Sequence, residues 1–405
     1  MTLKVCAEAS SIALRQFSYT LRLGKKSWWM ALLIWLIAAP AHAALELRVA
    51  VERDASQVSV GSSTNAVLKD VATNKEISQL PAMNAIVAEP KAGLVAFSQF
   101  QAGAIWVEPS NGGYVFVGDK WYRGRVLVVP TDGGLTAVNY VDLDQYLYSV
   151  VGGEMGSRFP MEALRAQAIA ARTYALYQRQ TSANDVFDVG DTTQWQYYDG
   201  LDQETAETRA AVDSTQDIVL TYNNQIINAV FSACSGGRTQ NSEDVWTSAL
   251  PYLRGVEDYD LTVTQALASC QWTMDISAQK LKQAVPNIGD IKGYSAEPSA
   301  NGKIAQIKFV GTSGERTLTG NQLREALGLR GIPSKIAVTQ TQPVASIGNP
   351  PVMPSAFQFS GGGYGHGIGL SQWGAFGMAQ MGQNYAQILL HYYTGVKLAK
   401  LEVRE

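Results

Sequence analysis

Cysteine and histidine are scarce in this sequence of 405 residues. Both residue types number three, at positions Cys6, Cys234, Cys270, His42, His366 and His391. A structural zinc site takes about four Cys or His ligands, and iron–sulfur clusters take Cys thiolates. The count therefore excludes proteins with several zinc sites and iron–sulfur carriers.

The sequence also lacks an excess of positive charge and a long apolar run. Its 32 Lys and Arg against 35 Asp and Glu give a net charge of −3, which is no reason to expect a nucleic-acid-binding protein. The apolar run Trp28–Ala39 has about 12 residues, whereas a membrane-spanning helix needs about 20. With 46% hydrophobic residues the chain can still bury a sizeable core, in about two or three domains by length.

The first 43 residues have the features of a secretory signal peptide. Arg15, Arg22, Lys25 and Lys26 precede the run WWMALLIWLIAA, and Ala41-His42-Ala43 follows it as a small-x-small cleavage signature. We expect cleavage after Ala43 and export to the periplasm or the cell-wall space. The alternative is an uncleaved anchor helix.

Export changes the redox state expected for the remaining cysteines. Five of the 32 basic residues and one of the 35 acidic residues precede position 44, so the exported chain has a net charge of −7. Cys6 and His42 leave with the leader, and Cys234 and Cys270 remain in an oxidising compartment. They are a plausible disulfide, with two separate buried thiols as the alternative.

The pattern of apolar and polar residues in the exported chain changes along its length. Residues 44–141 alternate apolar and polar side chains between Gly, Asn and Pro, which predicts a β-rich part. Residues 142–260 begin with two helices and continue as short strands and loops. Residues 261–338 read as an inserted α/β subdomain and 339–356 as a linker, and 357–405 hold a Gly-rich loop and final helices.

The two predicted helices flank an acidic residue. Asp142 can cap the first helix, which we expect to end at Gly152-Gly153, and a longer helix starts at Pro160. Glu154 lies between them in apolar surroundings, which raise the pKa of a carboxyl group and suit it to general acid catalysis. From location alone, a surface glutamate at a helix end is an equal alternative.

The segment Gly361–Gly382 is the richest in glycine. Its run GGGYGHGIGLSQWG is unlike an ordinary helix or strand interior, because each Gly costs about 0.5–1 kcal/mol there. A closing helix follows, with Asn384 as its cap, Gln387 as the reciprocal partner and Gly395 past its end.

Three other chemistries could in principle use these residues. The Gly-rich run lacks both the P-loop pattern and the dinucleotide fingerprint. A Ser-His-Asp arrangement would pair Ser235 or Ser371 with His366, but the sequence has no G-x-S-x-G elbow. A metal site would draw on all four of Cys234, Cys270, His366 and His391, although His391 lies on an apolar helix face that is more typical of the core.

Four blocks of the sequence resemble the SpoIID/LytB family of stage II sporulation protein D and amidase enhancers. The blocks are VDLDQYLYSVVGGEMGSRFPMEALRAQAIAARTYALY (141–177), TTQWQYYDG (192–200), FSACSGGRTQNSEDVW with PYLRGVED (231–258), and GGGYGHGIGLSQWGAFGMAQMGQNYAQILLHYYTGVKL (361–398). Their order and spacing fit, and they are long and specific. The similarity extends over most of the exported chain.

The resemblance implies an activity and a set of site residues. Sporulation members are lytic transglycosylases that cut peptidoglycan glycan strands and leave a 1,6-anhydro-muramic end, and other members enhance cell-wall amidases. The family's catalytic glutamate matches Glu154. Substrate-binding residues are implied at the positions matching the other family elements: Arg165, Arg172, Gln196, Tyr198, Ser235, Gly236, Gly237, Thr239, Tyr364, His366 and Gln372.

The sequence departs from the family at a zinc site that some members carry. Ser232 and Ser235 stand where those members have His and Cys, and Arg238 stands where they have His. We therefore expect no metal and no other cofactor, and we expect the Cys234–Cys270 pair to staple the same loop.

The expected fold is α+β, with mixed, mostly antiparallel sheets packed against the long 160–181 helix. A groove for substrate is expected between Glu154, the loop with Ser235-Gly236-Gly237, here called the S-G-G loop, and the Gly-rich loop. The leading hypothesis is a single-glutamate lytic transglycosylase, with Arg172 facing the substrate, and the alternative is a non-catalytic wall-binding module that stimulates an amidase. Expected partners are peptidoglycan strands and a cell-wall amidase or another wall-remodelling protein, with no nucleic acid and no membrane span after cleavage.

Overall fold

The computed structural model describes residues 4–6, 45–192, 194–343 and 352–402. The expected signal peptide at 1–43 lies outside these residues, apart from β1 (Lys4–Cys6), which pairs antiparallel with β25 (Lys397–Glu402). Among the described residues, no helix is both long and apolar enough to cross a membrane.

The N-terminal part is a pair of β-sheets around a shared apolar core. One sheet has the order β11-β10-β3-β6-β7-β8 and the other β14-β2-β13-β12-β9-β4-β5. Alternating residues such as Val58 and Val60 of one sheet and Val126 and Val128 of the other point into this core. The strands are β2 (Glu46–Ala55), β3 (Val58–Ser62), β4 (Ala66–Asp70), β5 (Glu76–Leu80), β6 (Asn84–Lys91), β7 (Leu94–Phe97), β8 (Phe100–Ala102), β9 (Ile105–Pro109), β10 (Val115–Val117), β11 (Lys120–Tyr122), β12 (Arg125–Thr131), β13 (Gly134–Asp142) and β14 (Val189–Gly190).

A helical body follows and is built around one buried helix. That helix, α3 (Met161–Thr181), packs against α2 (Leu143–Met155), α4 (Ala206–Asp213), α9 (Gln372–Gln380), α10 (Tyr385–Tyr392) and β15 (Ile218–Tyr222). Its side chains from Ala163 to Leu176 are nearly all buried, and many of them are alanines. Small side chains let neighbouring elements approach closely, which explains how one helix serves as the centre of so many contacts.

Capping residues set the ends of these helices. Asp142 accepts hydrogen bonds from the backbone N–H groups of Asp144 and Gln145, which confirms it as the cap of α2. Asn384 and Gln387 form the predicted capping box of α10. A further capping box, Thr205 with Thr208, begins α4 in a segment where the sequence analysis expected only strands and loops.

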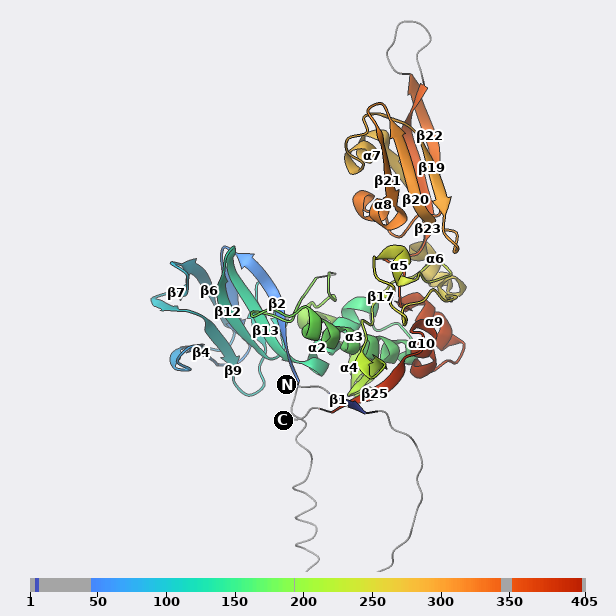
Figure 1. Cartoon of the computed structure of the whole chain (residues 1–405). Helices are drawn as coiled ribbons and strands as arrows, with labels where there is room; N and C mark the ends of the chain where they lie inside the picture. The colour runs from blue at the N-terminus through green and yellow to red at the C-terminus, as the bar shows by residue number, and fades with distance from the viewer. Residues whose placement is uncertain (1–3, 7–44, 193, 344–351, 403–405) are drawn as a thin grey trace, which may run out of the picture.

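The inserted segment has its own apolar core. Its two three-stranded sheets have the orders β18-β23-β22 and β19-β20-β21, and α7 and α8 pack against them. In Figure 1 this subdomain stands on one side of the helical body, opposite the N-terminal sheets. Its elements are α6 (Thr264–Cys270), β18 (Gln271–Ser277), α7 (Ala278–Ala284), β19 (Ile291–Pro298), β20 (Ile304–Gly311), β21 (Glu315–Thr319), α8 (Gly320–Leu327), β22 (Lys335–Pro343) and β23 (Val352–Gly362).

The structure corrects the expected linker at 339–356, because both ends of this range belong to strands. Residues 339–343 end β22 and residues 352–356 begin β23, while 344–351 lie outside the described residues. The two strands pair antiparallel from Lys335↔Ser360 to Pro343↔Val352. The polar residues 339–342 are exposed positions of β22, and β23 leads directly into the Gly-rich segment.

Short elements complete the body between these parts. They are η1 (Gly200–Gln203), β16 (Gln225–Ile226), β17 (Phe231–Ser232), α5 (Ser242–Val245), η2 (Asp260–Thr262) and β24 (Leu370–Ser371). Among the strands that the structure describes, two pairs are parallel, β14 with β2 and β17 with β24, and the other pairs are antiparallel. The fold is therefore α+β with mostly antiparallel sheets, as predicted.

Candidate functional site

Glu154 lies in the last turn of α2, which corrects the expectation that this helix ends at Gly152-Gly153. A Cβ atom on Gly152 would meet the carbonyl oxygen of Gln203 at 1.8 Å, and one on Gly153 would meet the ring of Tyr197 at 2.5 Å. The glycines are thus needed for close packing and not for a turn. The helix ends at Met155, with Gly156 at a φ of 72° as its C-cap.

The carboxylate of Glu154 contacts two amide groups. Its Oε1 accepts a hydrogen bond from the Tyr197 backbone N–H at 2.9 Å, and its Oε2 accepts one from Gln372 Nε2 at 3.4 Å. Burial raises the pKa of Glu154, and these two hydrogen bonds, which favour the charged form, offset only part of that effect. Nothing in the described chain adds a cation that would pull its pKa down.

Uncharged aromatic side chains surround this carboxyl group. Burial, together with the charge of Glu154, raises the pKa of Tyr174 to about 12 and also raises that of Tyr146, so both phenols are neutral. The ring of Tyr174 faces Phe231 of β17 at 6.4 Å between centroids. These groups keep the local environment apolar, which is the cause of the raised pKa of Glu154.

A second aromatic cluster joins the loop after Glu154 to the start of α9. Phe159 packs on Trp373 at 4.8 Å and edge-on to Phe376 at 5.3 Å between ring centroids. Trp373 directly follows Gln372, the residue that hydrogen-bonds Glu154. The cluster therefore ties together the two segments that hold the carboxyl group and its amide partner.

Gln196 and Tyr198 flank Tyr197 in the sequence and are both buried. The hydroxyl of Tyr146 donates to Gln196 Oε1, and the Tyr198 hydroxyl donates to Asn139 Oδ1 at 2.7 Å. Between them, the backbone of Tyr197 presents its N–H to Glu154 while its ring is 38% exposed. This burial argues against direct substrate contact by Gln196 and Tyr198, which instead position Tyr197.

Arg172 is also buried, with 1% of its surface exposed. Its guanidinium donates to Asp144 Oδ1 at 2.8 Å and to the carbonyl oxygens of Thr215 at 2.7 Å and Ile218 at 3.2 Å. The expected substrate-facing arginine is therefore corrected to one that joins α2, α3 and the start of β15. Arg165, on the same helix, pairs with Glu162 and donates to Ser214, away from Glu154.

The S-G-G loop is organised around a buried carboxylate that the sequence analysis missed. The backbone N–H groups of Ser235, Gly236 and Gly237 all donate to Asp260, at 3.0, 2.6 and 2.9 Å. Burial and the neighbouring Asp258 raise the pKa of Asp260 to about 6. The loop's donors are thus occupied inside the protein and do not face a groove.

Asp258 and Lys303 complete this buried network. The Ser235 hydroxyl donates to Asp258 at 2.5 Å, and the Lys303 ammonium group donates to the Ser235 carbonyl oxygen at 2.7 Å. Burial lowers the pKa of Lys303 to about 8. Thr239 is buried as well and accepts a hydrogen bond from the Val256 N–H. Lys303 comes from the inserted subdomain, so that subdomain helps to hold the S-G-G loop.

Cys234 and Cys270 form a disulfide, which confirms the predicted pair. With both sulfur atoms in this bond, the four-ligand set with His366 and His391 is not assembled, and His391 instead contacts the Glu257 carbonyl oxygen. The family's zinc arrangement does not fit these residues either, because Ser232, Ser235 and Arg238 stand at its ligand positions and the nearby Cys234 and Cys270 sulfurs are bonded to each other.

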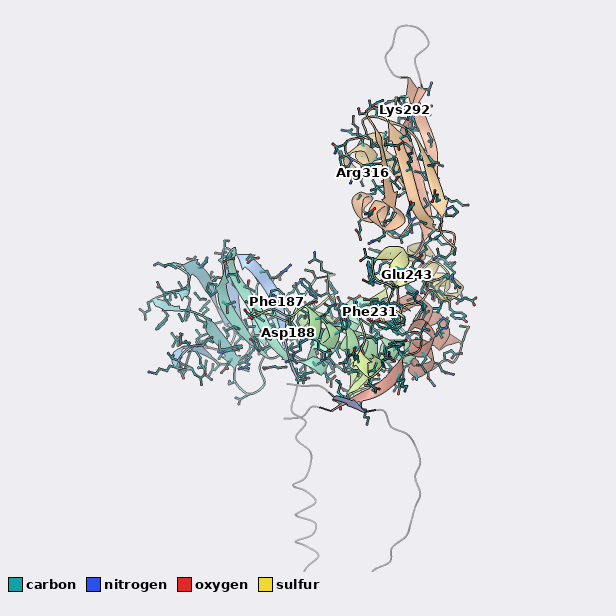
Figure 2. All side chains as sticks on the ribbon, viewed as in Figure 1. Phe187, Asp188, Phe231, Glu243, Lys292 and Arg316 are labelled. Carbon is teal, nitrogen blue, oxygen red and sulfur yellow. A yellow bond between two sulfur atoms is a disulfide. The ribbon has the colours of Figure 1, made fainter. Side chains whose placement is uncertain are left out.

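The Gly-rich loop runs beside the S-G-G loop. Tyr364 forms an antiparallel bridge with Cys234, and its side chain is 50% exposed. Nδ1 of His366 accepts a hydrogen bond from the Ile368 N–H, and burial lowers the pKa of His366 to about 4. Since Ser235 donates to Asp258, a Ser-His-Asp arrangement with His366 has no support in this geometry. Figure 2 shows Phe231 in the helical body below the inserted subdomain.

The sequence-predicted residues thus divide into two groups. Glu154 and Gln372 meet, and Tyr364 is exposed, whereas Arg172, Gln196, Tyr198, Ser235 and Thr239 are committed to internal contacts. Tyr197, Asp258, Asp260 and Lys303 were missed. Alternation in Q-Y-Y-D-G, where the flanking residues are buried, was a usable signal for the outward ring of Tyr197, but the sequence holds none for Lys303.

Comparison with known proteins gives two family matches and several relatives. The stage II sporulation protein family matches residues 131–222, and a domain of unknown function (DUF8618) matches residues 264–369. An uncharacterized protein of Brachyspira hyodysenteriae is 32% identical over 331 residues, which cover 80% of this chain and 84% of that protein.

Two relatives from Bacillus subtilis carry descriptive names. Stage II sporulation protein D is 31% identical over 299 residues, covering 66% of this chain and 77% of that protein. Amidase enhancer is 32% identical over 295 residues, but these cover only 40% of its length and 62% of this chain.

Proposed function

Because this chain belongs to the SpoIID/LytB family, which includes stage II sporulation protein D, we propose that it is an exported lytic transglycosylase that cleaves peptidoglycan glycan strands. The observation that carries the proposal is Glu154 itself. It is a carboxyl group with a pKa raised by burial, held by two amide donors, in an aromatic site. A group of this kind stays protonated at higher pH than an ordinary glutamate, as a general acid must.

The proposed reaction uses one carboxyl group twice. Protonated Glu154 gives its proton to the glycosidic oxygen as the C1–O bond of the muramic residue breaks. The resulting carboxylate then removes the proton from the C6 hydroxyl of the same sugar as O6 bonds to C1. The products are a 1,6-anhydro-muramic end and a free hydroxyl on the departing strand, and Glu154 returns to its protonated form.

The surroundings of Glu154 are consistent with a reaction that uses a single carboxyl group. Most glycosidases need a second carboxylate as nucleophile or base. In the described part of the chain no second carboxylate is close enough to shift the pKa of Glu154. Because the substrate supplies its own nucleophile, the transglycosylase reaction does not require one.

We assign the recognition of substrate charge near Glu154 to Arg158. This arginine lies in the loop between α2 and α3, directly before Phe159, and it is exposed. No carboxylate of the described residues pairs with it. Muramic residues of a peptide-free strand carry a lactyl carboxylate, and a free guanidinium is well suited to bind it. Arg158 takes the role first expected for Arg172.

The decisive experiment is digestion of peptide-free glycan strands with wild type and Glu154→Gln. We expect anhydro-muramic ends by mass spectrometry with wild type and a loss of about 10²–10⁴-fold in the variant. Glu207→Gln is the matched control, since Glu207 is an exposed acid on α4. Equal product from wild type and Glu154→Gln, or none from either, sinks the assignment.

The second candidate function is stimulation of a cell-wall amidase without glycan cleavage. It is favoured by the 32% identity to Amidase enhancer. In that case Glu154→Gln leaves stimulation of a purified amidase unchanged, and no anhydro-muramic ends form under any condition.

A further inference from the structure

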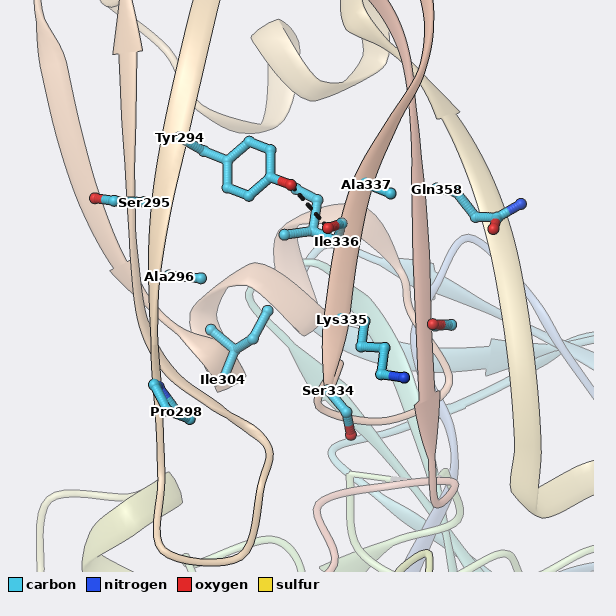
Figure 3. A pocket seen from close by; sticks show the side chains of 11 residues that line it. Tyr294, Ser295, Ala296, Pro298, Ile304, Ser334, Lys335, Ile336, Ala337 and Gln358 are labelled. Atoms are coloured by element: carbon cyan, nitrogen blue, oxygen red, sulfur yellow. Dashed lines mark hydrogen bonds between the residues drawn. The ribbon is translucent and has the colours of Figure 1, made fainter.

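The inserted subdomain carries a chain of three adjoining hollows. The largest, of about 590 Å³, lies between the S-G-G loop at Gly236 and strands β18 and β23. It shares Ser334, Lys335 and Ser360 with a hollow of about 500 Å³ between β19 and β22, seen in Figure 3. It shares Gln271, Trp272 and Thr273 with a third of about 260 Å³. The three hollows adjoin one another through these shared residues and are here together called the subdomain groove.

The charge of the subdomain groove has one sign. Its only charged lining side chains are Lys335 and Arg330, and no Asp or Glu lines any of the three hollows. Both cations are exposed, and neither pairs with a carboxylate anywhere in the described chain. Asp275 lies at the rim, where it accepts a hydrogen bond from Gln358, but the two exposed cations are not paired with it, so the lining itself suits an anionic ligand.

The uncharged polar lining consists of hydroxyl and amide side chains, beside apolar residues such as Leu261, Ile304 and Met274. The hydroxyl and amide groups come from Ser334, Ser360, Thr273, Gln271 and Gln358. The two aromatic side chains are already engaged, since Trp272 donates to the Gly363 carbonyl oxygen and Tyr294 donates to that of Ile336. This set matches a ligand rich in hydroxyl, acetamido and carboxylate groups.

The subdomain groove leads to the Gly-rich loop. Its floor at Ser360–Gly362 is the end of β23, which continues directly into that loop. Arg330 lies over the ring of Tyr364 at 6.0 Å, and its carbonyl oxygen accepts a hydrogen bond from the Gly365 N–H. From there the chain reaches Gln372, the partner of Glu154. Residues 367–371 of this segment are buried, so it joins the groove to the carboxyl group through the protein and not along an exposed path.

We propose that the subdomain groove is a remote subsite for the glycan strand, in which Lys335 and Arg330 bind lactyl carboxylates of peptide-free muramic residues away from the scissile bond. This inference rests on the proposed substrate class but not on cleavage. Binding energy from a remote part of a substrate can hold the reacting part in place. Strands long enough to reach the groove should therefore bind more tightly than short ones.

The test measures binding of labelled peptide-free strands to proteins that all carry Glu154→Gln, so that no strand is cut. Lys335→Gln with Arg330→Gln should weaken the affinity for long strands by about five- to tenfold. The same pair should leave the affinity for a single disaccharide unit unchanged. Lys292→Gln with Arg316→Gln removes the same charge from exposed positions of the subdomain outside the groove, labelled in Figure 2, and should change neither affinity.

Three results overturn the proposal: no loss of long-strand affinity, an equal loss in the control pair, or an equal loss with strands whose carboxylates are methyl-esterified. If Lys335→Gln with Arg330→Gln weakens binding of free stem peptides but not of bare strands, the proposal is also overturned and the groove is assigned to peptide. Failure of the proposed function is recognised separately. If wild type binds strands through the groove but forms no anhydro-muramic ends, cleavage is wrong and the subsite stands.

Discussion

Gln372 donates a hydrogen bond through Nε2 to Oε2 of Glu154 at 3.4 Å, across 218 positions of the sequence. The contact places the first residue of α9 against the last turn of α2. It also joins the Gly-rich segment to the acid that we propose as catalytic. The behaviour of Glu154 therefore depends on a segment near the other end of the chain.

The pH dependence of stability should report the raised pKa of Glu154. The unfolded chain releases this proton near 4.5 and the folded chain at higher pH, so the folded state holds more protons in between. The stability contributed by this group therefore falls as pH rises through that window. Glu154→Gln should melt at a higher temperature than wild type at pH 8, with the difference closing toward pH 4. A Glu207→Gln control that behaves identically would contradict this.

Gln372→Leu should move the alkaline limb of the pH–rate profile to higher pH. The hydrogen bond from Gln372 lowers the pKa of Glu154, so its removal lets burial raise that pKa further. Burial holds the pKa of His366 near 4, so this histidine stays neutral and does not shape the profile above pH 5. Gln380→Leu, at the exposed end of α9, serves as the control. An unmoved limb in Gln372→Leu would show that the contact does not tune Glu154.

Arg158→Gln should raise KM for peptide-free strands by about three- to tenfold with little change in kcat, because binding of the lactyl carboxylate is lost in ground and transition states alike. The effect should disappear on strands with methyl-esterified carboxylates. Arg316→Gln is a matched exposed arginine on the subdomain. A fall in kcat with constant KM would place Arg158 in the chemistry and reject a binding role.

Arg172 should matter for stability and not for substrate binding. Arg172→Ala leaves Asp144 and the carbonyl oxygens of Thr215 and Ile218 without their partner, at a cost of about 3–5 kcal/mol. Arg172→Lys keeps the charge with fewer donors and should cost about 1–3 kcal/mol. Urea unfolding measures both. The folded Lys variant should keep the wild-type KM, and a raised KM would revive the substrate-facing role.

Removal of the Cys234–Cys270 disulfide should lower stability by about 4 kcal/mol, since it closes a loop with a sequence separation of 36. The double variant Cys234→Ser with Cys270→Ser and the reduced wild type should unfold at similar, lower urea concentrations. Thiol titration of the unfolded wild type should find no free Cys234 or Cys270 thiol before reduction. Two free thiols, or unchanged stability after complete reduction, would reject the staple.

Local features of the sequence predicted much of the fold. Asp142 and Asn384 cap their helices, and alternation in 44–141 yields two sheets, because capping and burial of alternate side chains depend on near neighbours. The predictions failed where contacts with a segment distant in the sequence determine the local structure. Glycine is unfavourable inside a helix, yet α2 continues through Gly152 because the Gln203 carbonyl oxygen packs where a Cβ would lie.

The sequence by itself determined the family and the Cys234–Cys270 pair, and it predicted Glu154 as the catalytic acid, because these follow from residue types in a particular order. Only the tertiary structure decided which polar groups are available to a ligand. Asp260 occupies the S-G-G donors and Asp144 occupies Arg172, whereas Arg158, Arg330 and Lys335 are left exposed. A buried polar group must find a partner inside the protein, and that partner is chosen by packing between segments far apart in the chain.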